Sequence, residues 1–207
     1  MFDEKMAAAV ETAQKRLMNT TERESVLVAL ANDLSEMDGL VKKLDPSKID
    51  FDRGGLERIK AVGYWNRFEE NYPRIKAVFE RLERYRKILH NSITTAGRFE
   101  SEYLAVFEKF SAVSEDERDT EYMQQAAVAE NMRQLLRNTV TEHEAALEHL
   151  TRVLTLMTGS LEMAIYLAKQ KAGRTFDDTF SSVSVLGDVT SASFQAQYRQ
   201  LSDALGK

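Results

Sequence analysis

The chain has 207 residues, of which only two are proline and nine glycine, and it contains no cysteine. So few helix-breaking residues exclude a loop-rich or all-β protein, and the lack of cysteine excludes disulfide frameworks and thiolate metal sites. Hydrophobic residues make up 43% of the chain and charged residues 29%, with a net charge of −5 at pH 7. We therefore expect an all-α protein with an extended apolar core. Tight binding of nucleic acid is disfavoured, because it depends on neutralising phosphates.

A first helix is expected over residues 3–44. Its apolar residues recur every three or four positions, but the stripe changes phase by one residue near Thr20, which predicts a kink, a short turn or a stutter there. Pro46 and the pair Gly54 and Gly55 then interrupt the helical pattern. Residues 45–55 are therefore expected to form a connector.

The second expected helix, residues 56–113, carries the longest hydrophobic pattern. Positions spaced by three and four residues run from Ala61 to Val113, and Asn71 and Ser92 are the only polar ones among them. A repeat of 3.5 residues over roughly seven heptads is typical of a coiled coil. Pro73 predicts a bend or a restart, and the unbroken phase across it favours the bend.

A third helix is expected over residues 115–171, where a similar ladder runs from Leu136 to Ala168. Ser114 and Glu117 have the spacing of a capping box and predict its start. Two long helices joined by a turn at 112–116 form an antiparallel hairpin, and the first helix is the natural third member. The predicted fold is an elongated antiparallel bundle or coiled coil covering residues 1–172.

Charge is unevenly distributed over the two long helices. Residues 53–98 contain eleven Lys and Arg against five Glu, whereas residues 99–150 contain four Lys and Arg against twelve acidic residues. Folding about the turn places residue i near residue 227 − i, which brings Glu142 to Glu148 within reach of Arg81 to Lys87. These charges are predicted to form interhelical pairs beside the seam, each contributing little to stability.

The tail, residues 173–207, is rich in Ser and Thr and ends in a short amphipathic pattern. Phe194, Tyr198, Leu201 and Leu205 share one helical face, and Asp188 or Thr190 could cap the helix. We expect this helix to pack on the bundle. The alternative is a docking segment for a partner.

Catalytic and metal motifs are not evident. His143 and His149 lie in an acidic stretch, but neither has the spacing of a zinc helix or of a ferritin-type Glu-x-x-His site. His143 falls within the apolar ladder, where it is expected to set the register and to be a pH-sensitive core position. The apolar segment Val153 to Ala168 is expected to be a core helix rather than a membrane span. No cofactor, metal or enzymatic activity is expected.

The basic segment 53–98 has a functional interpretation as well as a structural one. Aromatic residues alternate there with Lys and Arg, a combination that binds anionic membranes or nucleic acids. Trp65, Tyr72 and Phe79 fall outside the ladder and are expected to be free of the core. The structural interpretation, core packing and ion pairing, is favoured. The candidate residues for binding an anionic surface are Arg74, Lys76, Arg81, Arg84, Arg86 and Lys87.

These observations favour a non-enzymatic helical scaffold or assembly subunit that binds proteins and associates with itself as a dimer or larger oligomer. Three amphipathic helices leave apolar residues uncovered, including Val26, Val28, Trp65 and Phe79. The N-terminal residues lack the basic and apolar run of a secretory signal, so a cytoplasmic protein is expected.

The second hypothesis is a peripheral membrane-binding rod that uses the basic segment. The expected arrangement resembles the coiled coils of BAR-type membrane-curving dimers. The shared features are three long helices in about 200 residues and candidate bending points at Pro73 and Gly97. The resemblance implies an anionic membrane surface as partner. A third hypothesis is a pore-forming or secreted component in which Val153 to Ala168 becomes exposed.

Overall fold

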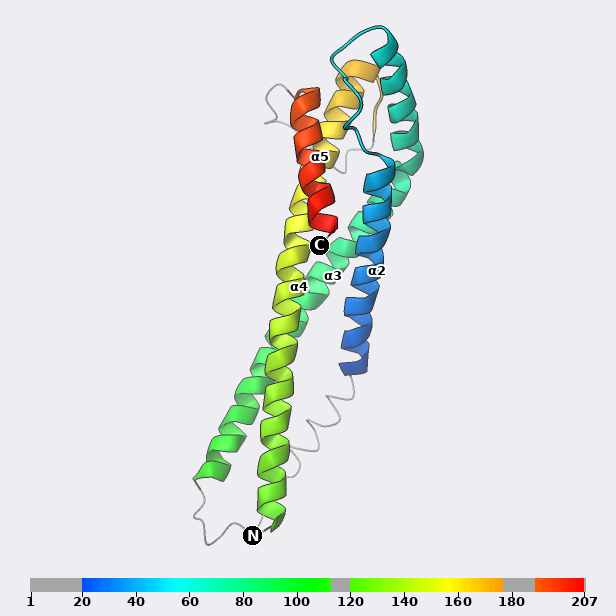
Figure 1. The fold of residues 1–207 in the computed structure, drawn as a ribbon. Coiled ribbons are helices and arrows are strands. Elements are labelled where there is room, and N and C mark those ends of the chain that lie inside the picture. Colours follow the sequence, from blue (N-terminus) through cyan, green and yellow to red (C-terminus); the bar gives the residue numbers. More distant parts are fainter. Residues whose placement is uncertain (1–19, 113–119, 177–188, 207) are drawn as a thin grey trace. The chain divides into compact units, whose positions relative to one another are not determined.

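The computed structural model describes residues 20–112, 120–176 and 189–206. Within these ranges the chain forms four helices and no strand (Figure 1). The helices are α2 (Thr20–Lys43), α3 (Leu56–Ser111), α4 (Thr120–Ala172) and α5 (Ser191–Leu205). The all-α prediction is confirmed, and the expected helices 3–44, 56–113 and 115–171 correspond to α2, α3 and α4. The predicted residues 1–19 and 113–119 lie outside the described part.

Helix α3 starts after Gly55, whose φ of 70° is a backbone conformation that glycine adopts without strain. It runs without a break through Pro73, so no restart occurs there. Figure 1 shows α3 changing direction in its amino-terminal half. A proline inside a helix removes one backbone donor and clashes with the preceding turn, which accounts for a change of direction without an end.

Two compact units share the long helices. The first unit consists of Met1–Ala29 with Tyr85–Glu148, and the second of Leu30–Arg84 with His149–Lys207. Both α3 and α4 therefore contribute residues to each unit. Helix α5 and the connector 44–55 belong entirely to the second.

The second unit is a helical bundle to which all four helices contribute. Its core follows from the 3-4 ladders, because the ladder positions of α2, α3 and α4 all turn inward. Its largest fully buried side chains are Met37, Leu44, Tyr64, Trp65, Phe68, Val78, Leu82, Leu150, Met157, Leu167 and Phe194. Burying each such side chain contributes roughly 1.5–3 kcal/mol. The segment Val153 to Ala168 lies in this bundle as part of α4, which confirms it as a core helix.

The first unit brings the second half of α3 against the first half of α4. Ala96, Tyr103 and Leu136 form its buried cluster. Two polar contacts fix the register: the Nδ1 of His143 lies 3.0 Å from the Oγ of Ser92, and a guanidinium nitrogen of Arg133 lies 3.9 Å from the carboxylate of Glu100.

The predicted register of this pair is wrong. It placed position 84 opposite His143, whereas the structure places Ser92 there. The physical reason is that a helical period identifies the buried face of a helix but not the axial position at which that face meets its partner. The predicted register depended only on the assumed turn at 112–116, and residues 113–116 of that turn lie outside the described part.

Candidate functional site

The basic residues of α3 were the main candidates for a functional surface, and the structure pairs two of them with α2. Arg81 binds Asp33 at 2.9 Å and Glu36 at 2.8 Å, and Arg74 binds Glu36 at 2.5 Å. The guanidinium group of Arg81 donates one hydrogen bond to each carboxylate oxygen of Asp33. Such two-point pairing makes an Arg–carboxylate ion pair stronger than a single contact does. The prediction that Arg81 pairs with Glu142 to Glu148 was wrong, because helical periodicity does not reveal which helix lies beside a face.

The other four candidates do not form one site with these two. Arg84 and Lys87 are exposed, and the Arg84 side chain donates to the carbonyl of Glu80 at 3.4 Å. Lys76 and Arg86 are half-buried. Arg86 and Lys87 belong to the first compact unit and the remaining candidates to the second. The set predicted from the sequence is thus divided between the two units.

The aromatic residues of the same segment are part of the core. Trp65 and Tyr72 are buried, so the prediction that they lie outside it was wrong, whereas Phe79 is half-buried. Phe51 of the connector packs on Trp65 and on Phe194, with ring centroids 5.1 and 5.9 Å apart. In this unit α3 is covered by α2, α4, α5 and the connector. A helix with that many neighbours buries a wider face than a two-helix seam does.

Helix α5 is held against the connector by polar contacts that the sequence did not suggest. The backbone N–H of Ser191 donates to the carboxylate of Asp52 at 3.0 Å, and the backbone N–H of Phe51 donates to the Oγ of Ser191 at 2.8 Å. Gln195 donates to the carbonyls of Pro46 and Ile49. These residues are about 140 positions apart, so no local pattern could reveal the contact.

The start of α5 also carries its own cap. The Thr190 side chain accepts a hydrogen bond from the backbone N–H of Ser193, and the Ser193 side chain accepts one from the backbone N–H of Thr190. The prediction of Thr190 as a cap is confirmed, while Asp188 lies outside the described residues. Asp52 adds a negative charge at the positive end of the helix dipole. The backbone N–H of Ser191, with Lys171 at 3.3 Å, lowers the pKa of Asp52.

Farther along α5, close packing accompanies the polar contacts. A Cβ on Gly159 of α4 would lie 2.8 Å from the side-chain nitrogen of Gln197, so glycine permits the approach of α5 to α4. The hydroxyl of Tyr198 donates to the carbonyl of Val41 at 2.8 Å, and burial raises the pKa of this tyrosine. The tail helix is therefore packed on the second unit, as expected.

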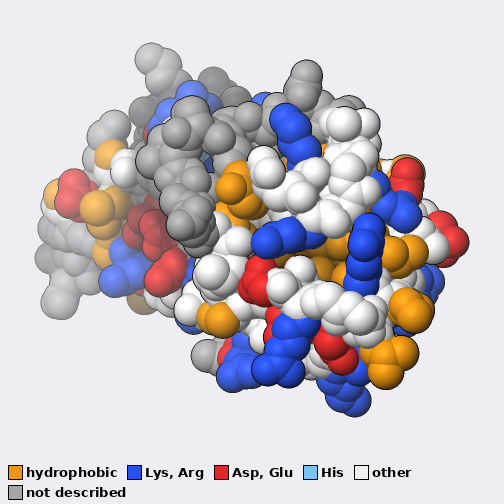
Figure 2. All heavy atoms as spheres, turned by 90° about the horizontal axis from the view of Figure 1, so that it is seen from above, with side chains coloured by type: hydrophobic (Ala, Val, Ile, Leu, Met, Phe, Trp, Pro, Cys, Tyr) orange, Lys and Arg blue, Asp and Glu red, His pale blue; other side chains and the backbone are white. Residues whose placement is uncertain are grey.

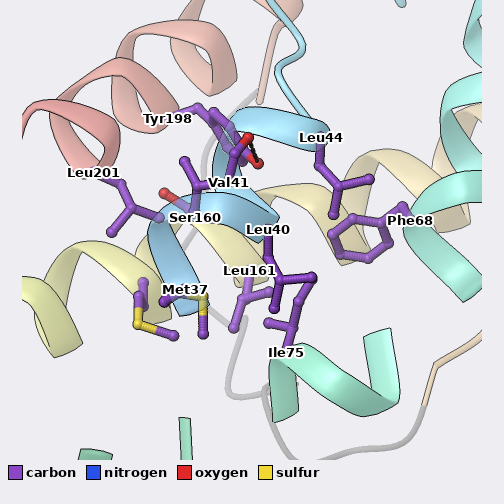
Figure 3. Close-up of a pocket in the computed structure, with 11 residues that line it drawn as sticks. Met37, Leu40, Val41, Leu44, Phe68, Ile75, Ser160, Leu161, Tyr198 and Leu201 are labelled. Atoms are coloured by element: carbon purple, nitrogen blue, oxygen red, sulfur yellow. Dashed lines mark hydrogen bonds between the residues drawn. The ribbon is translucent and has the colours of Figure 1, made fainter. Parts of the chain in front are cut away.

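A small cavity lies where α2, α3, α4 and α5 of the second unit meet (Figure 3). Its volume is about 20 Å³, and its lining is apolar except for Ser160 and Tyr198. Sites for small organic ligands are typically about 300–1,000 Å³. The cavity is a packing defect with room for about one water molecule, and it supports no ligand site.

A wider hollow of about 350 Å³ lies on the surface between the end of α2 and α5. Lys42 and Arg199 line it together with Asp45 and Asp203. Lys42 is also paired with Asp38 at 2.5 Å. Because cations and carboxylates are mixed along its wall, the hollow selects neither anions nor cations.

His143 lies where the ladder placed it. Its side chain is buried in the first unit, and its Nδ1 lies at hydrogen-bond distance from Ser92, one of the two polar ladder positions of α3. The other polar position, Asn71, donates to the carbonyl of Arg67 and accepts from Lys43. The expected role of His143 in setting the register is compatible with this contact, and its sensitivity to pH stays a prediction.

Large apolar side chains on the surface are the remaining candidates for function. They include Val28, Ile88, Leu104, Met123 and Leu135 in the first unit, and Leu56, Ile59 and Val62 in the second. The sequence analysis named only Val28 among them. The others escaped it because exposure depends on which neighbouring helices cover a face.

No protein-family model matches the chain, and comparison with curated proteins and with solved structures finds no match either. Within the ranges that the structure describes, no helix is long and apolar enough to span a bilayer. The His, Asp and Glu residues of those ranges form no cluster of three or more that could hold a metal ion.

Proposed function

We propose that this protein is a non-enzymatic helical scaffold or assembly subunit that associates with itself and with protein partners. The observation that carries the proposal is the set of exposed large apolar side chains on the first unit, especially Ile88, Leu104, Met123 and Leu135. Removing apolar surface from water is favourable, so a protein partner that covered these side chains would be stabilised by the contact. A cytoplasmic location, expected from the sequence, is part of this proposal.

The scaffold core is proposed to be an antiparallel coiled coil of α3 and α4. The contacts of the first unit support this arrangement, because Ser92 contacts His143 while Glu100, farther along α3, approaches Arg133, earlier in α4. Polar side chains within a heptad seam favour one register over others at some cost in stability. The Ser92–His143 contact would serve that purpose here.

The contacts that polar and charged side chains make within the chain also support a scaffold. Arg81, Asp52 and His143, which have the chemical character of catalytic or binding groups, contact other residues of the same chain. Groups engaged in this way hold helices together. They are poorly placed to act on a substrate.

Changing the four apolar residues of the first unit tests the proposal. A variant with Ile88→Gln, Leu104→Gln, Met123→Gln and Leu135→Gln should sediment at a lower mass than the wild type at equal concentration. Gln is a good helix former and these positions are exposed, so the far-ultraviolet circular dichroism should be unchanged. The matched control replaces Leu56, Ile59 and Val62 with Gln in the second unit and should keep the wild-type mass. Equal masses for the wild type and the fourfold variant would contradict the proposal.

A further inference from the structure

The first two turns of α3 are unusual because their outer face is apolar. Leu56 is 78% exposed, Ile59 69% and Val62 46%. With a rotation of about 100° per residue, these three side chains occupy one arc of about 120° on the helix. Tyr64 and Trp65, which are buried, lie on the opposite side. The apolar arc therefore faces away from the core of the second unit.

Basic side chains border this arc on both edges. By the same rotation, Arg58 lies about 40° beyond Val62, and Lys60 lies about 40° beyond Leu56. Both are exposed, and so is Arg53 just before the helix. Figure 2 views the upper end of Figure 1 and shows Lys and Arg side chains there, with hydrophobic and acidic side chains among them.

Acidic residues near the arc are engaged with these cations. Glu57 pairs with Lys60 at 2.6 Å and accepts from the backbone N–H of Asp50, and Asp50 pairs with Arg53 at 3.2 Å. Glu57 lies about 100° from Leu56, on the side of the buried residues. Between residues 56 and 62 the apolar arc contains no acidic residue, and the exposed Glu70 lies on the same side of α3 about two turns farther along.

An apolar arc bordered by Lys and Arg is the arrangement of helices that lie in a membrane interface. We propose that the start of α3, with Leu56, Ile59 and Val62 inserted and Arg53, Arg58 and Lys60 at the headgroups, docks on an anionic membrane surface. This goes beyond the proposed scaffold. Within the basic segment 53–98 that the sequence predicted to bind a membrane, it places the contact at residues 53–62 and not at the candidate residues Arg74 to Lys87.

Two observations favour a lipid surface over a protein. A second copy docking through the same face would bring its own Arg58 and Lys60 to the border of the arc and would supply no acidic residue from its arc to pair with them, whereas anionic headgroups would. A specific protein interface engages roughly 20–30 residues on each side, whereas this arc offers three apolar side chains. Insertion into a lipid surface requires only a few, because cations on the edges add their attraction to anionic headgroups.

Vesicle flotation of the full chain tests the proposal. The wild type should bind vesicles of phosphatidylcholine with phosphatidylserine, bind phosphatidylcholine alone at least about tenfold more weakly, and lose binding as salt is raised. The variant with Leu56→Gln, Ile59→Gln and Val62→Gln should bind the anionic vesicles at least about tenfold more weakly. The variant with Arg58→Gln and Lys60→Gln should also bind more weakly. The matched control, with Ile88→Gln, Leu104→Gln, Met123→Gln and Leu135→Gln, should bind as the wild type does.

The absence of cysteine allows a direct measurement of insertion. An environment-sensitive dye on Ile59→Cys should shift its emission to the blue on anionic vesicles and be quenched by spin-labelled lipid, while the same dye on Met123→Cys should not respond. No wild-type binding to anionic vesicles, or unchanged binding by the Leu56, Ile59 and Val62 variant, would overturn the proposal. It would equally be overturned if that variant lost mass in sedimentation and not vesicle binding, since the arc would then be a protein interface. The scaffold proposal is judged on mass alone, so the two can fail separately.

Discussion

At the scale of single residues, polar side chains inside the helical pattern decide how the helices meet. Ser92 and His143 each interrupt an apolar ladder, and the structure places them together. Asn71, the other polar ladder position of α3, likewise meets Lys43 of α2. A buried polar group without a partner costs about 1–3 kcal/mol, so such groups favour the register in which they meet.

The contact between Ser92 and His143 can be measured with a double-mutant cycle. His143→Leu and Ser92→Ala should each lower the free energy of unfolding by about 1–3 kcal/mol, because each leaves its partner without this contact. The double variant should lose less than the sum of the two. Urea denaturation gives the values. Thr139→Ala, which removes an exposed hydroxyl bound within its own turn, is the control and should change stability by about 0.5 kcal/mol or less. Strict additivity would show that the contact does not couple the helices.

Asp52 provides a test that depends on pH. Its folded pKa is lowered, chiefly by the backbone N–H of Ser191, so its contribution to stability is present above its unfolded pKa of about 3.9 and is lost as pH falls through the folded value. Asp52→Asn should therefore lower the free energy of unfolding at pH 7. The loss should be at most about 1 kcal/mol because the side chain is 41% exposed.

The difference between the wild type and Asp52→Asn should shrink as the pH falls below about 4. Denaturation curves across this range measure it. Asp203→Asn, an exposed carboxylate elsewhere on α5, serves as the control and should change stability little at either pH. A difference between wild type and Asp52→Asn that grew towards acid pH would contradict the role assigned to Asp52.

At the scale of elements, α5 is a small helix whose position depends on one buried ring. Phe194 is fully buried and contacts Phe51, which in turn contacts Trp65, the single tryptophan of the chain. Phe194→Ala should lower the free energy of unfolding by about 3–5 kcal/mol. It should also shift the emission of Trp65 to the red and reduce the hydrogen-exchange protection of α5. Gln200→Ala, on the exposed side of α5, is the control, and equal behaviour of the two variants would refute the docking of α5 through Phe194.

The register of α3 on α4 can be tested by disulfide crosslinking, since the chain has no cysteine of its own. Glu100→Cys with Arg133→Cys should form a crosslink within one chain, because these side chains approach each other in the structure. Glu100→Cys with Ala127→Cys corresponds to the register predicted from the sequence and should crosslink poorly. Mass spectrometry of peptides from monomeric protein identifies the bond. The opposite preference would restore the earlier register.

The sequence revealed which face of each helix is buried but not what covers it. Val78, Leu82, Leu150 and Leu154 turn inward as their spacing predicted, because a period of three and four residues reports a face directly. Trp65 was misplaced because a narrow seam was assumed where several neighbours surround α3. Contacts such as Arg81 with Asp33, or Asp52 with Ser191, join residues far apart in the chain, and periodicity within one helix carries no information about them.

At the scale of the whole molecule, the chain forms two compact units. Helices α2, α3 and α4 contribute residues to both, and each unit exposes large apolar side chains. Those of the first unit, such as Ile88 and Leu135, are proposed to meet protein. The arc of the second unit, Leu56 to Val62, lies between Arg58 and Lys60 and is proposed to meet lipid.

Sedimentation equilibrium of the full-length wild type, over a wide range of concentrations and without vesicles, tests the central claim most directly. One chain has a mass of 23.6 kDa. The scaffold account predicts a mass at least twice that value, falling towards one chain on dilution as an associating system must. A mass of one chain at every concentration would contradict it.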